Sequence, residues 1–127
     1  MSDVLTTFFA LIDALTETRD AEAAIALYAT DEDVVFSGST QDEVGFGPEA
    51  VAAVLRAIVA SPTRLSLSPE RRQVREEDNV AWANITGRIR VEEPGTAPRD
   101  APYRITAIFV RRDGAWRWHT FNGSEPV

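Results

Sequence analysis

Cysteine and lysine are absent from this chain of 127 residues, and His119 is its only histidine. The lack of cysteine excludes disulfide bonds, thiolate catalysis and cysteine-ligated metal sites. A single imidazole also excludes a histidine-rich metal site within one chain. We therefore expect a functional site without a metal, and no motif in the sequence predicts a cofactor.

Positive charge and long apolar runs are also scarce. The 13 basic residues stand against 20 acidic ones, which gives a formal net charge of −7. A field of this sign repels polyanions, so we expect neither nucleic acid nor an anionic membrane surface as a partner. No apolar run is long enough to span a bilayer, and residues 1–20 lack the basic start of a signal peptide. The sequence therefore predicts a cytoplasmic protein.

The residues that are present are typical of a globular chain. Apolar residues make up 44% of the sequence and aromatic residues 9%, unlike the aromatic-poor composition of disordered chains. A chain of this length buries roughly two-thirds of its unfolded surface, which is enough for one hydrophobic core. We therefore expect one domain that covers residues 1–127.

Helical periodicity dominates the first half of the chain, where apolar residues recur at three- and four-residue spacing. The pattern predicts a first helix of about fifteen residues near the N-terminus, a shorter helix over 20–28, a buried strand at 34–36 and a helix over 48–60. Glycines and polar residues without periodicity predict a loop at 37–47.

From residue 63 onward the apolar period changes to two. The expected strands cover 64–68, 72–77, 80–91, 103–111 and 115–121, with Gly87 as a bend in the longest one. Helices followed by strands predict an α+β fold, in which three N-terminal helices pack on the concave face of a curved antiparallel sheet. The expected shape is a cone whose open end would form a pocket.

Three stretches give the chain a family resemblance: LYATDEDVVFSGS, STQDEVGFGPEAVAAVL and WRWHTFNGSEP. In these stretches, and in the order of its elements, the chain resembles the SnoaL-like branch of the nuclear transport factor 2 and ketosteroid isomerase superfamily. The resemblance implies a cone-shaped domain, usually dimeric, whose interior can hold a small apolar ligand. It implies no single activity, because the same fold carries isomerases, cyclases, hydrolases, dehydratases and non-catalytic association domains.

The resemblance also implies positions for the residues of the isomerases. Their general-base aspartate would fall on or beside Phe36, which cannot take a proton. Their tyrosine donor would come from the first helix, where Phe8 and Phe9 stand and no tyrosine occurs. Ketosteroid isomerase chemistry is therefore disfavoured.

Glu43 is the candidate catalytic residue. It lies in the glycine-rich loop beside Phe46, and this loop could fold over the mouth of the cone. Burial there would raise its pKa toward the range that suits general acid–base catalysis. The alternative is that Asp42 and Glu43 are solvated loop acids, or that Glu43 caps the helix that begins at Pro48.

The terminal strand supplies further candidates. Strict alternation places Trp116, Trp118, Thr120 and Asn122 on one face, which we expect to line the cone, and Arg117, His119 and Phe121 on the other. His119 would then have a structural role. The alternative is that the tryptophans are core residues and that Asn122 closes the strand with a turn.

Two functions remain open from the sequence. In the first, the chain binds or transforms a small apolar molecule by acid–base chemistry of the isomerase, cyclase or hydrolase type. The predicted ligand-binding residues are Tyr28, Phe36, Phe46, Trp116, Trp118, Thr120 and Asn122. In the second, it is a non-catalytic association module whose cone is filled by aromatic rings, namely Phe9, Phe36, Trp116 and Trp118. For either function we expect a homodimer through the outer sheet face, anchored by Trp82 and Phe121.

Overall fold

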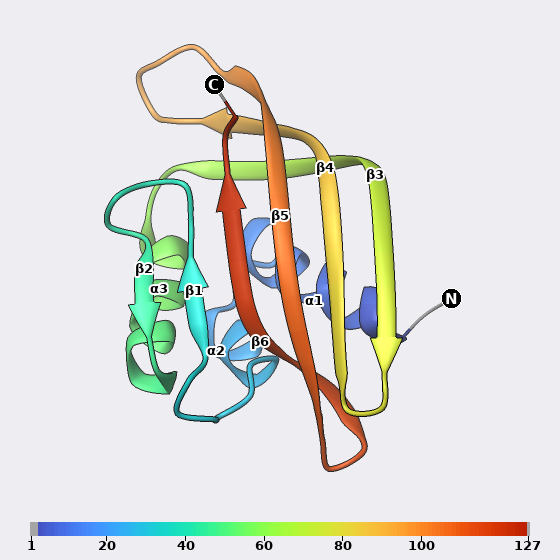
Figure 1. Ribbon diagram of the computed structural model, residues 1–127. Helices are drawn as coiled ribbons and strands as arrows, with labels where there is room; N and C mark the ends of the chain where they lie inside the picture. Colours follow the sequence, from blue (N-terminus) through green and yellow to red (C-terminus); the bar gives the residue numbers. More distant parts are fainter. Residues whose placement is uncertain (1–2, 127) are drawn as a thin grey trace.

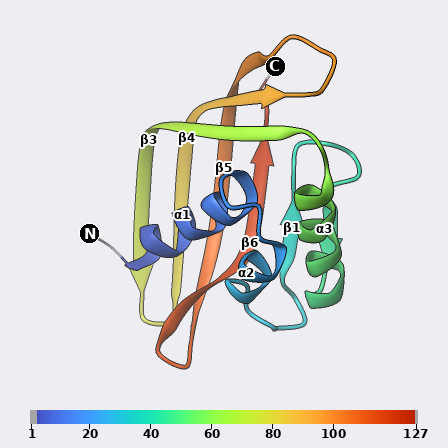
Figure 2. The same ribbon diagram turned by 180° about the vertical axis from the view of Figure 1, so that it is seen from behind.

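A computed structural model describes residues 3–126 and confirms the α+β prediction (Figure 1). The helices are α1 (Asp3–Thr16), α2 (Ala21–Ala26) and α3 (Pro48–Ala60). The strands are β1 (Val35–Ser37), β2 (Val44–Phe46), β3 (Arg64–Glu77), β4 (Val80–Glu92), β5 (Arg99–Arg112) and β6 (Ala115–Ser124). All six strands form one curved sheet, and the helices lie on one face of it (Figure 2).

The three helices begin and pack as their sequences predict. In α1 the apolar positions at helical spacing, among them Phe8 and Leu11, are buried against the sheet. In α2 the carboxylate of Asp20 caps the helix and accepts a hydrogen bond from the backbone N–H of Ala23 at 3.1 Å. Pro48 occupies the first turn of α3. Within residues 3–126 no helix is both long enough and apolar enough to cross a membrane.

The strand order across the sheet is β2-β1-β6-β5-β4-β3. Strands β1 and β6 pair in parallel, and every other neighbouring pair is antiparallel. In β4 burial alternates along the whole strand, with Ala81, Ala83 and Ile85 buried and Trp82 on the outer face. This alternation confirms the predicted division of the strand into a helix-facing and an outward-facing side.

Gly87 marks the bend that the sequence predicts. Here β3 and β4 turn together, so that their far halves cross the top of the sheet (Figure 1). A Cβ atom at Gly87 would lie 2.2 Å from the carbonyl oxygen of Ser68, and the pairing register of β3 shifts between Pro69 and Arg71. Glycine permits this close approach, and the extra residue in β3 increases the local curvature. The two strands expected at 64–68 and 72–77 are therefore one bulged strand.

The segment predicted as a loop, 37–47, is partly a hairpin. Strand β2 pairs with β1, with Val44 opposite Ser37, and only residues 38–43 are irregular. Three-residue strands are too short to establish a period of two, which is why the sequence pattern did not separate them from the loop.

Strand β6 contains a bulge that reverses part of the predicted facing. Ile108 pairs with Thr120 and Phe109 pairs with Trp118, so His119 is an extra residue without an opposite partner. Strict alternation is therefore broken at His119. Trp116, Trp118 and Phe121 all point into the core, whereas Asn122 is exposed on the other face. The predictions that Asn122 lines the cone and that Phe121 lies outside it are wrong for this reason.

Aromatic rings fill the end of the core beside α2. Trp118 is completely buried, with its ring centroid 5.2 Å from that of Phe8 and 4.7 Å from that of Phe109. Its Nε1–H donates to the carbonyl oxygen of Thr7 at 3.1 Å. The hydroxyl of Tyr28 donates to the carbonyl oxygen of Val35 at 2.9 Å, so both polar groups of this cluster are satisfied. This end of the fold is closed by packed side chains.

Candidate functional site

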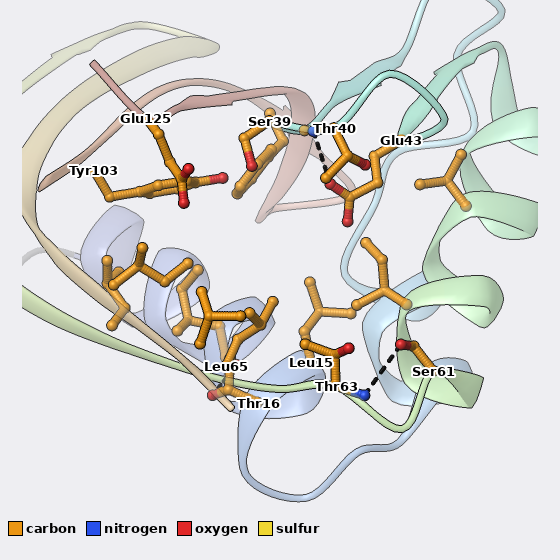
Figure 3. Close-up of a pocket in the computed structure, with 18 of the residues that line it drawn as sticks. Leu15, Thr16, Ser39, Thr40, Glu43, Ser61, Thr63, Leu65, Tyr103 and Glu125 are labelled. Carbon is orange, nitrogen blue, oxygen red and sulfur yellow. Dashed lines mark hydrogen bonds between the residues drawn. The ribbon is translucent and has the colours of Figure 1, made fainter. Parts of the chain in front are cut away.

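The opposite end of the core is hollow. A cavity of about 490 Å³ lies between the C-terminal half of α1, the helix α3, the β1–β2 loop and the concave face of the sheet (Figure 3). Its inner wall is hydrocarbon, with residues such as Leu15, Phe36, Ile58, Leu67, Ile89 and Phe121. The curvature produced at Gly87 carries the far halves of β3 and β4 over this space, and so creates the cavity roof.

Glu43 reaches the cavity from the β1–β2 loop. The loop is held by the backbone N–H of Gly38, which donates to the carbonyl oxygen of Glu43 at 2.7 Å. One carboxylate oxygen of Glu43 accepts from the backbone N–H of Thr40 at 3.2 Å. The side chain points into the cavity beside Ser39 and Thr40 (Figure 3). A tight turn thus places an ionisable group at the boundary between apolar wall and solvent.

Tyr103 faces this carboxylate from strand β5, together with Glu125 (Figure 3). Its side chain is 7% exposed, and burial raises its pKa above 10.0. A hydrogen bond with the side chain of Ser39 acts in the opposite direction, while the charges of Glu43 and Glu125 raise the pKa further. At neutral pH the phenol is therefore protonated and can donate a hydrogen bond at the cavity mouth.

Gly123 makes room for this phenol. A Cβ atom at Gly123 would lie 2.4 Å from the hydroxyl oxygen of Tyr103 and 2.9 Å from Cε1 of Phe121. No real side chain tolerates contacts of this length, so glycine is required for the observed position of Tyr103. The Asn-Gly-Ser sequence near the end of β6 therefore serves the site through its glycine.

The rim of the cavity is acidic. Its described lining residues include four carboxylates, those of Asp42, Glu43, Glu93 and Glu125, and one guanidinium, that of Arg99. Arg99 forms an ion pair with Glu125 at 3.0 Å, and both side chains are partly exposed. A pair so accessible to water adds little to stability, and its effect is to neutralise one of the four carboxylates.

Of the residues singled out from the sequence, the structure brings Glu43 and Phe36 to the cavity. Trp116, Trp118 and Tyr28 are buried in the closed core instead. Phe46 is 74% exposed on β2, and the side chains of Thr120 and Asn122 point away from the cavity because of the bulge at His119. Phe46, Thr120 and Asn122 are therefore misplaced by the sequence prediction, the first because β2 turns its side chain outward.

The sequence prediction missed Tyr103, Ser39 and Glu125. A signal for Tyr103 was present, since Tyr103 shares the helix-facing side of β5 with Ile105 and Phe109. Ser39 and Glu125 lie in a loop and in the C-terminal segment, where no periodicity exists to orient a side chain. No three histidine, aspartate or glutamate side chains within residues 3–126 gather in the manner of metal ligands.

Comparison with known folds agrees with this architecture. A candidate dehydratase of the NTF2-like family from Streptomyces avermitilis superposes with a TM-score of 0.85, at 19% sequence identity over 98% of this chain and 94% of that one. A candidate calcium/calmodulin-dependent protein kinase II association domain from Xanthomonas campestris gives a TM-score of 0.77, at 21% identity over 97% and 85% of the two chains. At these identities the likeness concerns the fold alone.

A further structural neighbour is a nuclear transport factor 2-like superfamily protein from Salmonella enterica serovar Typhimurium, with a TM-score of 0.80 and 11% identity over 98% of this chain and 89% of that one. A comparison with curated protein sequences found no match. The SnoaL-like domain matches the sequence over residues 4–127. The chain therefore belongs to the family of SnoaL-like domains.

Proposed function

We propose that this domain binds a small, largely apolar molecule in the cavity and holds the polar end of that molecule between Glu43 and Tyr103. The observation that carries the proposal is the cavity itself, whose volume of about 490 Å³ lies within the range of small-molecule sites. Much of its wall is apolar, and Glu43 and Tyr103 lie on one side of it, an arrangement that buries a hydrocarbon body and orients one functional group (Figure 3).

Two groups at the mouth support acid–base chemistry on the bound molecule. The carboxylate of Glu43 can accept a proton, and the protonated phenol of Tyr103 can donate a hydrogen bond to an oxygen that becomes negative. These groups suit isomerisation, cyclisation, hydrolysis or loss of water, which need no metal or covalent nucleophile. The candidate dehydratase among the structural neighbours is named for a reaction of this kind.

The binding proposal is tested with a cavity-filling variant and phenethyl alcohol as a neutral probe. Leu67→Trp places an indole in the cavity, and Phe46→Trp places the same indole on the exposed side of β2, where Phe46 is 74% exposed and does not line the cavity. Binding measured by NMR titration is expected in the wild type and in Phe46→Trp, and is expected to be lost in Leu67→Trp. Equal binding to both variants would contradict the proposal.

The outer sheet face supports a second proposal, that two copies of the chain form a homodimer. Val80, Trp82 and Ile108 are exposed there, and Trp82 is directly opposite Ile108 on the neighbouring strand. Beside them the hydroxyl of Thr106 donates to the amide oxygen of Asn84 at 3.0 Å. A flat apolar patch with satisfied polar neighbours suits a self-complementary interface. The Xanthomonas neighbour, described as an association domain, is consistent with it.

Sedimentation equilibrium distinguishes the two oligomeric states. The wild type is expected at twice the mass of a single chain, and Trp82→Glu is expected at the mass of one chain. Arg104→Glu serves as the matched control, because it introduces the same residue at an exposed position near the end of the same sheet face. A wild-type particle with the mass of one chain at micromolar concentration would refute the dimer.

The purely associative alternative required a core filled by aromatic rings, and these rings leave the cavity end open.

A further inference from the structure

The carboxylate of Glu43 meets the cavity without a cationic partner. Within residues 3–126 none of the ion pairs includes Glu43, and the guanidinium of Arg99 at the rim pairs with Glu125 instead. The polar contact of Glu43 is the backbone N–H of Thr40 at 3.2 Å. Its charge is therefore only partly balanced, at the edge of an apolar wall where charge interactions are stronger than in water.

The acidic character of the mouth is assembled by the fold from separate parts of the chain. Asp42 and Glu43 come from the β1–β2 loop, Glu93 follows β4, and Glu125 follows β6. Two of these carboxylates influence the same group, because the charges of Glu43 and Glu125 both raise the pKa of the buried phenol of Tyr103. The fold thus gathers negative charge from three separate segments at the mouth.

The hydrogen-bonding groups at the mouth are mainly acceptors. Carboxylate oxygens accept only, and the hydroxyl oxygens of Ser39, Thr40 and Tyr103 each have lone pairs to offer. A protonated amine has N–H donors and no acceptor, so it matches this set. A ligand carboxylate would instead face like charges, and the one guanidinium of the rim already pairs with Glu125.

We infer that the cavity takes an apolar amine, a compound with one protonated nitrogen and a hydrocarbon body, whose ammonium group lies between Glu43 and Tyr103. The hydrocarbon body would contact the inner wall formed by residues such as Leu15 and Leu65, which lie beneath these polar groups (Figure 3). This inference rests on the proposed binding function and adds the charge of the ligand to it.

Three probes with a shared skeleton test the inference: phenethylamine, phenethyl alcohol and hydrocinnamate. They are positive, neutral and negative at neutral pH, and their affinities are measured by calorimetry at low ionic strength, where charge effects are largest. We expect the amine to bind about tenfold more tightly than the alcohol, and the carboxylate to bind at least tenfold more weakly than the alcohol. A tenfold change in affinity corresponds to only part of the interaction energy between two charges at the edge of an apolar site.

Glu43→Gln supplies the residue-specific readout. It keeps the size of the side chain and removes the charge, so the ratio of the amine affinity to the alcohol affinity should fall from about ten to about one. Glu49→Gln removes the same charge from an exposed position in α3 outside the cavity and should leave the affinities of all three probes unchanged.

The outcomes separate the two proposals. Suppose that the alcohol binds to the wild type and that Leu67→Trp abolishes this binding, but that the carboxylate binds as tightly as the amine. The inference is then overturned and the binding function stands. An amine preference that survives Glu43→Gln overturns the inference as well. If none of the three probes binds, both the binding function and the inference are overturned.

Discussion

Replacing Gly123 with alanine tests whether the end of β6 is built around Tyr103. The added methyl group would lie 2.4 Å from the hydroxyl oxygen of Tyr103 and 3.0 Å from its Cζ, against an ordinary contact of about 3.5–4.0 Å. One contact is with the end of a side chain, so the phenol can move, but it must then leave its position near Ser39. Phe121, 2.9 Å from the methyl group on the other side, limits the movement.

The expected cost follows from these distances. Overpacking of a dense site typically lowers the free energy of unfolding by about 1–3 kcal/mol. Urea denaturation followed by circular dichroism should show a lower midpoint with an unchanged slope. Ser124→Ala, a change at the next, exposed residue, should leave the midpoint within error of the wild type.

Removal of the hydroxyl provides the decisive comparison. Tyr103→Phe deletes the atom at 2.4 Å, so Gly123→Ala should cost at least about 1 kcal/mol less in the Tyr103→Phe background than in the wild type. Part of the cost remains, because Phe121 and the ring carbon of residue 103 still crowd the methyl group. Equal costs in the two backgrounds would show that the phenol does not determine the need for glycine, and the reasoning would be refuted.

Three further predictions concern titration and the β6 bulge. Burial raises the pKa of both Tyr28 and Tyr103 above 10.0. Their contribution to stability is therefore present below pH 10.0 and is lost as the pH rises through the pKa of the folded state. Tyrosinate absorbance should appear together with unfolding, and a tyrosine titration midpoint at pH 10.0 in the folded protein would contradict this. The hydrogen bonds from Arg112, at 2.6 and 3.2 Å, lower the pKa of Asp31 from 3.8, so Asp31→Asn should lower the urea midpoint at neutral pH and match the wild type in acid below the folded pKa; equal midpoints at neutral pH would exclude a contribution of this pair. Deletion of His119 should leave a folded protein, because Trp118 and Thr120 keep their present partners, whereas an alanine inserted after His119 would turn Phe121 out of the core and should abolish cooperative thermal unfolding.

The long strands were the most predictable part of the fold. In β4 burial alternates through all 13 residues without a break, with small and apolar residues on the inner face and mostly polar residues on the outer one. Such a length makes the period of two unambiguous, because a single shift would expose every apolar residue of the strand at once. Gly87 could be assigned as a bend for the same reason, since it was the one residue on the inner face without a side chain.

The facing of β6 could not be predicted, because its bulge depends on tertiary partners. Nothing near His119 in the sequence distinguishes a regular strand from a bulged one. In the structure the imidazole lies between the hydroxyl of Thr120, at 2.7 Å, and the carboxylate of Asp33, at 3.0 Å. Asp33 is far away in the chain, so this stabilisation of the extra residue is invisible to a local pattern. One residue changed the predicted surroundings of Thr120, Phe121 and Asn122.

The candidate site combines a part that local sequence can indicate with a part that only the fold assembles. Glu43 was recognisable as an acid in a glycine-rich loop, but Tyr103 is distant in the sequence and lines the same cavity because β5 lies beside a bent β4 and because Gly123 leaves space. The aromatic cluster around Trp118 holds the opposite end of the sheet closed, and Phe121 joins this cluster to the cavity wall. Phe36, Phe121 and Tyr103 serve both the core and the cavity, whereas Asp42 and Glu43 lie in the loop and outside the core. Substitution of these loop acids can therefore change which molecule is bound at little cost to folding, which is one physical basis for a single fold carrying many activities.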